Sequence, residues 1–464
     1  MPQSPVETVV AQARAAQTQF ESANQATVDE LIVGLAWAIL APETNRSLAE
    51  QAVRDTGLGV VEDKITKNHR KTLGLLRDLR NAPSVGVIRE LPEQGLVEIA
   101  RPVGVVGAVT PSTNPIATPL NKTLNSIKGR NAVILAPSPK GAAVCQRIVE
   151  LLQAVLRRHG HPQHLIQKLP SPINKDATHE LMQLADLLVV TGSQSNVRAA
   201  YRSGTPAIGV GAGNVAVIID ETTDLAAAAG KIAASKSFDN ATSCSSENSV
   251  VIVDAVYDKA IAALVAAGGR LLNPEETQTL QAALWQQGRL NPALIAKPAT
   301  EIAEAVGLHC PEMAQLRMLL VAEIGTGREY PFSGEKLCPV LTVYRATDFV
   351  AACEQVRKIY EFQGKGHSVG LHSQDESRAL EIGLKVPTCR VIVNQAHCFA
   401  TGGNFDNGMP FSLSMGCGTW GGNSISDNLN YRHYLNIVRI VRPIAPLEPS
   451  VEEIFGAYWS KHGR

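Results

Sequence analysis

The stretch "VGVVGAVTPSTNP" (103–115) begins as an apolar run and then turns polar around two prolines. A short apolar run that ends in a Pro-containing turn predicts a strand buried on both faces. A helical pattern over 116–128 follows, then an apolar run over 131–139, a helix over 142–160 and another apolar run over 185–193. Apolar strands that alternate with helices are typical of a parallel, doubly wound sheet.

Residues 235–415 show the same pattern again, with strands near "VVIVD", "VLTVYR", "SVGLHS" and "RVIVNQ". Two segments stand apart from both blocks: a hairpin over 84–102, which turns at "LPEQGL", and a late strand over 434–444. We therefore predict an α/β fold with two doubly wound parallel-sheet domains and a small β arm. The predicted domains are 1–234 and 235–415, followed by a C-terminal segment, 416–464.

Composition narrows the class of protein. The 464 residues carry 43 Lys plus Arg and 43 Asp plus Glu, so no basic excess favours nucleic acid or an anionic membrane surface. The longest apolar runs are too short to cross a bilayer, and the N-terminus has a helical pattern rather than that of a signal peptide. The eight cysteines are scattered, without metal-binding spacing, which favours a reduced cytoplasmic protein with no metal.

One cysteine lies among small polar residues in "SKSFDNATSCSSENSVVIVD" (235–254). Cys244 has Ser243 and Ser245 beside it and a strand just after it. Backbone and hydroxyl donors in such a loop can stabilise a thiolate and then an oxyanion. Composition alone leaves two interpretations open, a nucleophile or an incidental cysteine in a polar loop.

From this segment outward, the sequence resembles the aldehyde dehydrogenase superfamily. Within it, the chain is similar to the coenzyme-A-acylating branch, which includes the aldehyde dehydrogenase half of bifunctional alcohol/aldehyde dehydrogenases and acylating sulfoacetaldehyde dehydrogenases. Seven motifs occur in family order: "VTPSTNP" (109–115), "APSPK" (136–140), "VVTGS" (189–193), "GVGAGN" (209–214), "FDNATSCSSE" (238–247), "EKLCP" (335–339) and "GCGTWGGNS" (416–424). The resemblance implies that Cys244 is the nucleophile and that the Asn114 amide donates to the oxyanion.

The resemblance also implies a dinucleotide site in the first domain. Gly192 and Ser193 would receive the pyrophosphate at a helix N-terminus, and Glu335 would accept from the nicotinamide ribose. Lys140 would lie near the adenosine ribose, where a cation favours NADP over NAD, although an exposed lysine is an equal alternative. The remaining expected cofactor contacts are Thr110, Pro111, Ser138, Gly211 and Leu337.

The route of deacylation follows from a missing residue. In hydrolytic members of the superfamily, a Glu that activates water is the first residue of the segment that corresponds to "GVGAGN". This chain has Gly209 at or next to that position. No carboxylate occurs from Ala207 to Val217. Without a general base, water attack on the thioester should be slow, and we expect coenzyme A to take the acyl group. A phosphate-dependent semialdehyde reductase also uses a Cys without this Glu and remains an alternative. A non-enzymatic nucleotide-binding protein is a further one, disfavoured by the presence of Cys244, Asn114 and Glu335 together.

The substrate is predicted to be a small polar aldehyde, with sulfoacetaldehyde as the single best choice. Short hydrogen-bonding residues are expected around the pocket, and a long alkyl chain would leave them unsatisfied. They are Thr113, Thr242, Ser243, Ser245, Thr401, Asn404 and Asn407, with Arg432 and His433 adding positive charge in the tail. Acetaldehyde, propionaldehyde and glycolaldehyde are the alternatives, and His367 is a possible coenzyme A contact but more typical of a core histidine. The resemblance further implies a homodimer or homotetramer that pairs through the hairpin and the late strand, and the short tail leads us to expect no alcohol dehydrogenase domain.

Overall fold

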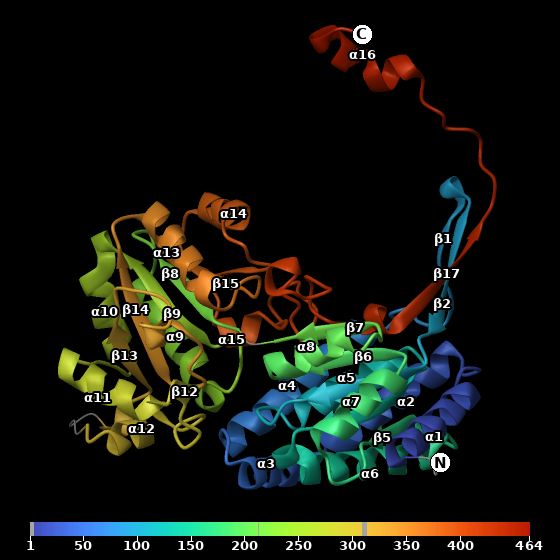
Figure 1. The fold of residues 1–464 in the computed structure, drawn as a ribbon, viewed down its shortest axis with the longest axis horizontal. Coiled ribbons are helices and arrows are strands. Elements are labelled where there is room, and N and C mark those ends of the chain that lie inside the picture. The colour runs from blue at the N-terminus through green and yellow to red at the C-terminus, as the bar shows by residue number, and fades with distance from the viewer. Residues whose placement is uncertain (1–3, 212, 309–312) are drawn as a thin grey trace.

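The structure is a computed structural model that describes residues 4–211, 213–308 and 313–464; Cys310 lies outside this part of the chain. Two α/β bodies lie side by side, and a slender arm leads from one of them to the C-terminal helix (Figure 1). The predicted fold class, two parallel-sheet bodies and a small β arm, is therefore confirmed.

Four helices precede the first sheet: α1 (Pro5–Phe20), α2 (Gln25–Leu40), α3 (Pro42–Thr56) and α4 (Val61–Leu79). Helix α1 begins at a capping box, because Ser4 and Glu7 each bond the other's backbone N–H. Its apolar positions Val6, Val10 and Ala13 are buried, as their helical spacing predicts. Among the described helices, none is by itself long and apolar enough to cross a membrane; only the bent pair α2 and α3 meets the length and composition requirements together.

The first sheet is parallel, with strand order β5-β4-β3-β6-β7. The chain builds outward from β3 in one direction and then, from β6, in the other. Ligands of doubly wound sheets bind where the order reverses, at the carboxyl ends of the strands. The strands are β3 (Val105–Thr110), β4 (Ala132–Pro137), β5 (Ile166–Lys168), β6 (Leu187–Thr191) and β7 (Ala207–Val210); the helices are α5 (Ala117–Lys128), α6 (Ala142–Arg158), α7 (Lys175–Leu184) and α8 (Gln194–Arg202).

The second sheet has seven parallel strands in the order β10-β13-β14-β9-β8-β15-β16. They are β8 (Val215–Ile219), β9 (Glu247–Val253), β10 (Gly269–Leu271), β13 (Met318–Ala322), β14 (Val340–Ala346), β15 (Val369–His372) and β16 (Val391–Val393). The helices of this body are α9 (Leu225–Ser237), α10 (Tyr257–Ala266), α11 (Pro274–Leu284), α12 (Ala299–Ala305), α13 (Phe349–Phe362), α14 (Glu376–Lys385) and α15 (His397–Ala400), with a small hairpin of β11 (Trp285–Gln286) and β12 (Arg289–Leu290).

The predicted boundary after residue 234 is wrong for the sheets. Strand β8 pairs with β9 and β15, and α9 packs against β9 and α10, so both belong to the second body. The chain passes between the bodies after Val210 and before Val215. The apolar run of β8 looks like the runs before it, and no local feature tells which sheet receives it.

The arm is a three-stranded antiparallel sheet of β1 (Gly86–Leu91), β2 (Leu96–Pro102) and β17 (Leu435–Val441). The predicted hairpin and late strand are both present, and within one chain they pair with each other. Helix α16 (Val451–His462) ends the chain far from both bodies (Figure 1).

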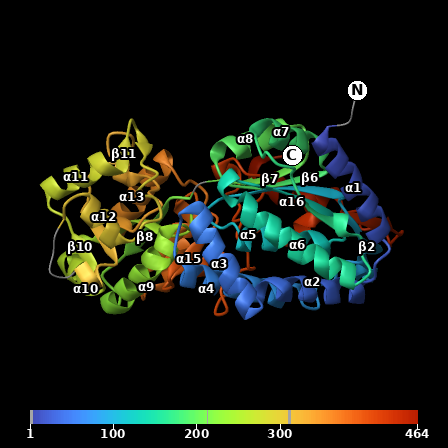
Figure 2. The ribbon, with the colours of Figure 1, turned by 90° about the horizontal axis from the view of Figure 1, so that it is seen from below.

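Helices α3 and α4 lie where the two bodies meet, as both views show (Figures 1 and 2). Helix α4 contacts α5 of the first body and the loop Phe238–Ala241 of the second. Its side chains can therefore reach the space between the sheets.

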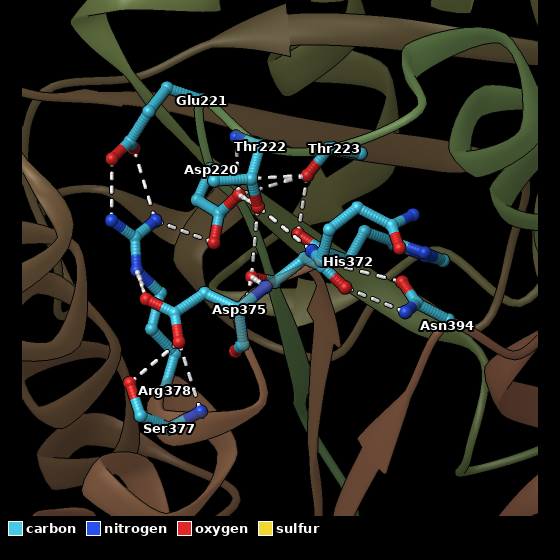
Figure 3. A network of polar contacts seen from close by, with 11 residues as sticks. Asp220, Glu221, Thr222, Thr223, His372, Asp375, Ser377, Arg378 and Asn394 are labelled. Carbon is cyan, nitrogen blue, oxygen red and sulfur yellow. Dashed lines mark hydrogen bonds and ion pairs between the residues drawn. The ribbon is translucent and has the colours of Figure 1, made fainter.

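A polar network closes the carboxyl ends of β8, β15 and β16 (Figure 3). Arg378 of α14 forms ion pairs with Asp220 at 2.6 Å, Glu221 at 2.5 Å and Asp375 at 3.5 Å. Burial raises the pKa of the Asp220 carboxyl, but hydrogen bonds, including that from Arg378, outweigh it and hold this pKa below its ordinary value. Asn394 joins the network through bonds to the Ser373 backbone. This network locks the outer edge of the second sheet.

Candidate active site

A cavity of about 1100 Å³ lies between the two bodies. One wall comes from the segments that follow β3, β4, β6 and β7, which is where a doubly wound sheet binds ligands. The loop before β9 forms the opposite wall. Most predicted site residues line this cavity: Thr110, Pro111, Thr113, Asn114, Ser138, Gly192, Ser193, Gly211, Thr242, Ser243, Cys244, Ser245, Glu335 and Leu337.

The loop that carries the nucleophile has an unusual backbone. Asp239, Asn240 and Ala241 have φ angles of 50°, 52° and 58°, in the left-handed region that non-glycine residues avoid. Such residues cost about 1–3 kcal/mol each and persist only where surrounding contacts hold them. Asp239 supplies those contacts, because its carboxylate accepts from the Val60 N–H at 2.8 Å and its own N–H donates to Asp63 at 2.7 Å.

Two lysines of α4 share the same buried carboxylate. Lys64 and Lys67 approach Asp239 at 3.1 and 2.5 Å, and all three side chains are almost completely buried. Burial raises the pKa of the Asp239 carboxyl, but Lys67 and Lys64 outweigh it and keep this pKa below its ordinary value. Burial also lowers the pKa of Lys64 to about 8. The group ties α4 to the nucleophile loop.

Lys67 also sets the direction of the Asn114 amide. Its ammonium donates to Asn114 Oδ1 at 2.9 Å and to Thr242 Oγ1 at 3.2 Å, while the Thr242 hydroxyl donates to Asp239. Because Oδ1 is occupied by a cation, the Nδ2 donor of Asn114 is left for another partner. One lysine therefore connects Asn114 of the first body to the Cys244 loop of the second.

Cys244 is a free, half-buried thiol. Burial raises the pKa of this thiol to about 12, and the charges of Glu335 and Cys417 act in the same direction. The backbone of Gly213 lies directly against it, since a Cβ on Gly213 would lie 2.1 Å from the Cys244 carbonyl oxygen. Any side chain at 213 would displace the nucleophile.

Glu335 carries the only carboxylate among the described residues that line the cavity. Burial raises its pKa to about 8, against the opposing effect of Lys236 and Lys336, and the Gly213 N–H donates to it. Gly209, which the sequence resemblance places at or next to the expected position of a general base, is tightly packed. A Cβ on Gly209 would lie 2.7 Å from Val197 Cγ1 and 3.2 Å from the Tyr201 ring.

The wall built by the first sheet suits a dinucleotide. Both Thr110 and Ser138 line the cavity, and their buried hydroxyls have no hydrogen-bond partner among the described residues. Ser193 caps the N-terminus of helix α8, because its hydroxyl accepts from the Asn196 N–H, and Gly192 just before it has open space around its Cα. An exposed helix start of this kind receives pyrophosphate well. Among the described residues, no group of His, Cys, Asp or Glu is arranged to hold a metal ion.

Several predicted residues lie elsewhere. Lys140 is exposed and outside the cavity lining. Thr401 is fully buried and donates to the His397 carbonyl, and Asn404 accepts from Arg70 beside a second, smaller cavity, so the prediction that both line the Cys244 pocket is wrong. The loop turns them away because their polar groups serve its own bonds and those of α4. Asn407 likewise bonds Gln395 and the Ala400 carbonyl.

Three histidine and arginine positions are also outside the cavity lining. His367 is buried and shares a hydrogen bond with Ser368, as a core histidine would. Arg432 and His433 lie at the start of the arm strand β17, where His433 contacts Asp427.

Sequence reasoning missed the cations of this site. Lys67 and Lys71 of α4 and Lys175, Arg198 and Arg202 around α7 and α8 were not selected, although all but Lys67 line the cavity. A signal existed on α4: positions 64, 67 and 71 follow a three- and four-residue spacing, which places them on one helical face. Alone, however, such a pattern usually marks a solvated face.

The match to known proteins agrees with this geometry. A model of the aldehyde dehydrogenase family matches residues 1–308. The chain is 59% identical to the acylating sulfoacetaldehyde dehydrogenase of Cupriavidus necator over 99% of this chain and 93% of that protein. It is 38% identical to the acetylating succinate-semialdehyde dehydrogenase of Clostridium kluyveri over 97% and 99% of the two chains.

A solved structure shows the same likeness in three dimensions. The acetylating aldehyde dehydrogenase of Geobacillus thermoglucosidasius superposes with a TM-score of 0.91 at 36% identity, covering 96% of this chain and 98% of that one. The resemblance drawn from seven sequence motifs is thereby confirmed. This chain belongs to the aldehyde dehydrogenase family.

Proposed function

We propose that this protein is a coenzyme-A-acylating aldehyde dehydrogenase. It oxidises a small aldehyde with NAD(P)⁺ and transfers the acyl group to coenzyme A, giving acyl-coenzyme A, NAD(P)H and a proton. One observation carries the proposal. The free thiol of Cys244 and the amide of Asn114 share a cavity in which Glu335 is the single carboxylate among the described lining residues.

Attack begins at Cys244. The thiol loses its proton to solvent, which is the proton released in the overall reaction, and its sulfur bonds to the aldehyde carbon to form a thiohemiacetal whose oxygen carries the negative charge. The Nδ2 group of Asn114, fixed by Lys67, and the Cys244 N–H stabilise this oxyanion. These donors act at the position where charge develops, so they lower the barrier to attack.

Hydride loss then gives a thioester on Cys244. The nicotinamide, when bound, accepts the hydride. Thr110, Ser138, Gly192, Ser193 and Glu335 would hold the dinucleotide, and the hydroxyls of the first two have no hydrogen-bond partner among the described residues.

Deacylation uses a second thiol. The sulfur of coenzyme A attacks the thioester carbon, the bond to Cys244 breaks, and the proton of the incoming thiol returns to the Cys244 sulfur. Water is disfavoured, because position 209 is a glycine without a carboxylate and burial raises the pKa of Glu335 to about 8, which keeps it largely protonated near neutral pH. Glu335 is the single carboxylate among the described lining residues. The energy of the thioester is thus conserved.

Sulfoacetaldehyde is the proposed substrate. The relative that is 59% identical bears that substrate in its name, and the similarity extends over almost the whole of both chains. Three of the short hydroxyls that favoured a polar substrate already have partners within the protein, since Ser243 and Ser245 share a bond at 2.8 Å and Thr242 donates to Asp239. Recognition of the anionic group of this substrate therefore requires other residues of the cavity.

Assembly and location complete the proposal. The arm exposes apolar side chains on β17, including Val438, Ile440 and Val441, and an open strand edge of this kind is normally covered. We propose a homodimer or homotetramer built through the arm. A reducing compartment, the cytoplasm, suits an enzyme that depends on a free thiol.

A substrate assay tests the function. Purified protein is given each aldehyde with NAD⁺ or NADP⁺, and reduced nicotinamide is followed by absorbance with coenzyme A, with phosphate, or with neither. We expect sustained turnover only with coenzyme A. Sustained turnover with phosphate would favour the semialdehyde reductase alternative, and turnover with neither would show that water accepts the acyl group.

A further inference from the structure

Lys71 is a cation of the cavity that the mechanism does not use. It lies one helical turn beyond Lys67 on α4, is half-buried, and lines the same cavity as Cys244. Its ammonium donates to the carbonyls of Gly402 at 2.9 Å and Gly403 at 3.2 Å. An ammonium has three N–H donors, so these two bonds orient the group and leave one donor for a ligand.

Among the described residues, Lys71 has no carboxylate partner. Lys64 and Lys67 share Asp239, whereas Lys71 forms no ion pair among the described residues. Burial lowers the pKa of Lys71, the charges of Arg70 and Lys67 lower it further, and the thiols of Cys398 and Cys244 act in the opposite direction. The ring of Phe411 lies 5.4 Å from the Lys71 nitrogen. A cation withdrawn from water without an acidic partner is unfavourable unless a ligand supplies the anion.

The neighbouring cation on helix α4, Arg70, has different surroundings from Lys71. Arg70 points to Asn404, at 2.5 Å, and lies over the rings of Phe399 and Phe405, beside the second cavity. Lys71 instead lies next to Gly402 and within electrostatic reach of Cys244. Lys71 is thus a positive charge in the lining of the Cys244 cavity that forms no ion pair among the described residues.

We propose that Lys71 binds the anionic group of the substrate, a sulfonate or carboxylate carried on the same small aldehyde that Cys244 attacks. This inference rests on the proposed function, and it assigns the selection of charged over neutral aldehydes to one side chain. An ion pair within the cavity would form a charge-assisted hydrogen bond with the free N–H. A neutral aldehyde gains nothing from it and leaves the ammonium unpaired.

A set of substrates against two variants tests the assignment. Wild type, Lys71→Met and the exposed control Lys385→Met are assayed with sulfoacetaldehyde, succinic semialdehyde and propionaldehyde. In Lys71→Met we expect kcat/KM to fall at least tenfold for an anionic substrate, mostly through KM, with less than threefold change for propionaldehyde. Loss of a single charge-assisted bond corresponds to roughly 10–150-fold. The anionic substrate that shows the larger loss of kcat/KM tells whether the site fits a sulfonate or a carboxylate better.

The outcomes against the proposal are distinct. An equal loss for all three aldehydes would show that Lys71 only supports the fold or the chemistry, and no loss for either anion would show that another group binds them. Lys385→Met, whose side chain is paired with Glu381 on the outer surface, should match wild type.

A binding measurement separates this inference from the proposed function. Calorimetry with isethionate, a sulfonate of similar size that lacks the aldehyde, requires no turnover. If no aldehyde is oxidised, the proposed function fails, while binding that is at least tenfold weaker in Lys71→Met still supports the anion site and equal binding overturns it. If Lys71→Met does not fold, wild type is titrated at pH 7 and pH 10. Because burial lowers the pKa of Lys71 to about 8, isethionate should bind at least tenfold more weakly at the higher pH, and unchanged binding overturns the inference.

Discussion

Arg378 at the outer edge of the second sheet and Lys71 in the cavity are both partly buried cations, yet their surroundings differ. Three carboxylates, those of Asp220, Glu221 and Asp375, surround Arg378 (Figure 3). Among the described residues, Lys71 forms no ion pair, and it donates to the backbone carbonyls of Gly402 and Gly403. The protein provides counter-charges where a cation locks its fold. We infer that the protein leaves a cation without a carboxylate partner where a bound ligand supplies the negative charge.

The cavity and the network should therefore respond to substitution in different ways. Changes in the cavity should alter catalysis with little effect on stability, and changes in the network should do the reverse. The buried group of Lys64, Lys67 and Asp239 lies between these cases, because it supports a strained loop and also orients Asn114.

The largest effect is expected at the nucleophile. In Cys244→Ala we predict that kcat falls by roughly a thousandfold or more, since no bond to the aldehyde carbon can form. The melting temperature and the binding of NAD(P)⁺, measured by calorimetry and fluorescence, should stay close to wild type. Turnover near the wild-type rate in this variant would contradict the mechanism.

Removal of the oxyanion donor should come next. In Asn114→Ala we predict a loss of about 10²–10³-fold in kcat, the usual effect of deleting one such donor. Asn114→Asp retains the shape but not the donor, and it adds an anion beside Lys67, so it should be no more active than Asn114→Ala. Steady-state kinetics with the preferred aldehyde measure both, and an Asn114→Ala enzyme within threefold of wild type would remove Asn114 from the mechanism.

Alkylation of Cys244 should depend strongly on pH. Burial raises the pKa of the thiol to about 12, and only the thiolate reacts with iodoacetamide. Without cofactor, the rate should therefore rise about tenfold per pH unit from pH 8 to pH 10, as the small thiolate fraction grows. Peptide mass spectrometry at Cys244 follows the rate. A plateau below pH 8 would show that the thiol is already ionised in the free enzyme.

The smallest effect on catalysis is expected in the network. Arg378→Met leaves Asp220 buried without its cation, and we expect unfolding to become easier by roughly 2 kcal/mol or more. Urea unfolding measures this change, while kcat should stay within twofold of wild type. The stabilisation depends on a carboxyl whose pKa is lowered in the folded state, so it is present above the ordinary carboxyl pKa and is lost as pH falls toward the folded value. A large loss of kcat in Arg378→Met would break the contrast with the cavity.

Local patterns in the sequence were enough for the architecture and for much of the site. Apolar runs in the sequence predicted the buried strands. Asn114 and Cys244 line one cavity because each lies in a loop next to a strand, after β3 and before β9. Contacts with other parts of the chain decide which sheet includes β8. They also decide where the side chains of Thr401 and Asn404 point. The roles of Lys67 and Lys71 could not be predicted for the same reason, because their partners, Asp239 and Gly402, are distant in the sequence.

The central claim is that Cys244 carries an acyl group that waits for coenzyme A. Enzyme mixed with aldehyde and NAD(P)⁺ in the absence of coenzyme A should give a burst of about one NAD(P)H per active site and then stop. Intact-protein and peptide mass spectrometry should then find the acyl group on Cys244, and added coenzyme A should release it as acyl-coenzyme A. Continued turnover without coenzyme A, or a burst that leaves Cys244 unmodified, would contradict the account.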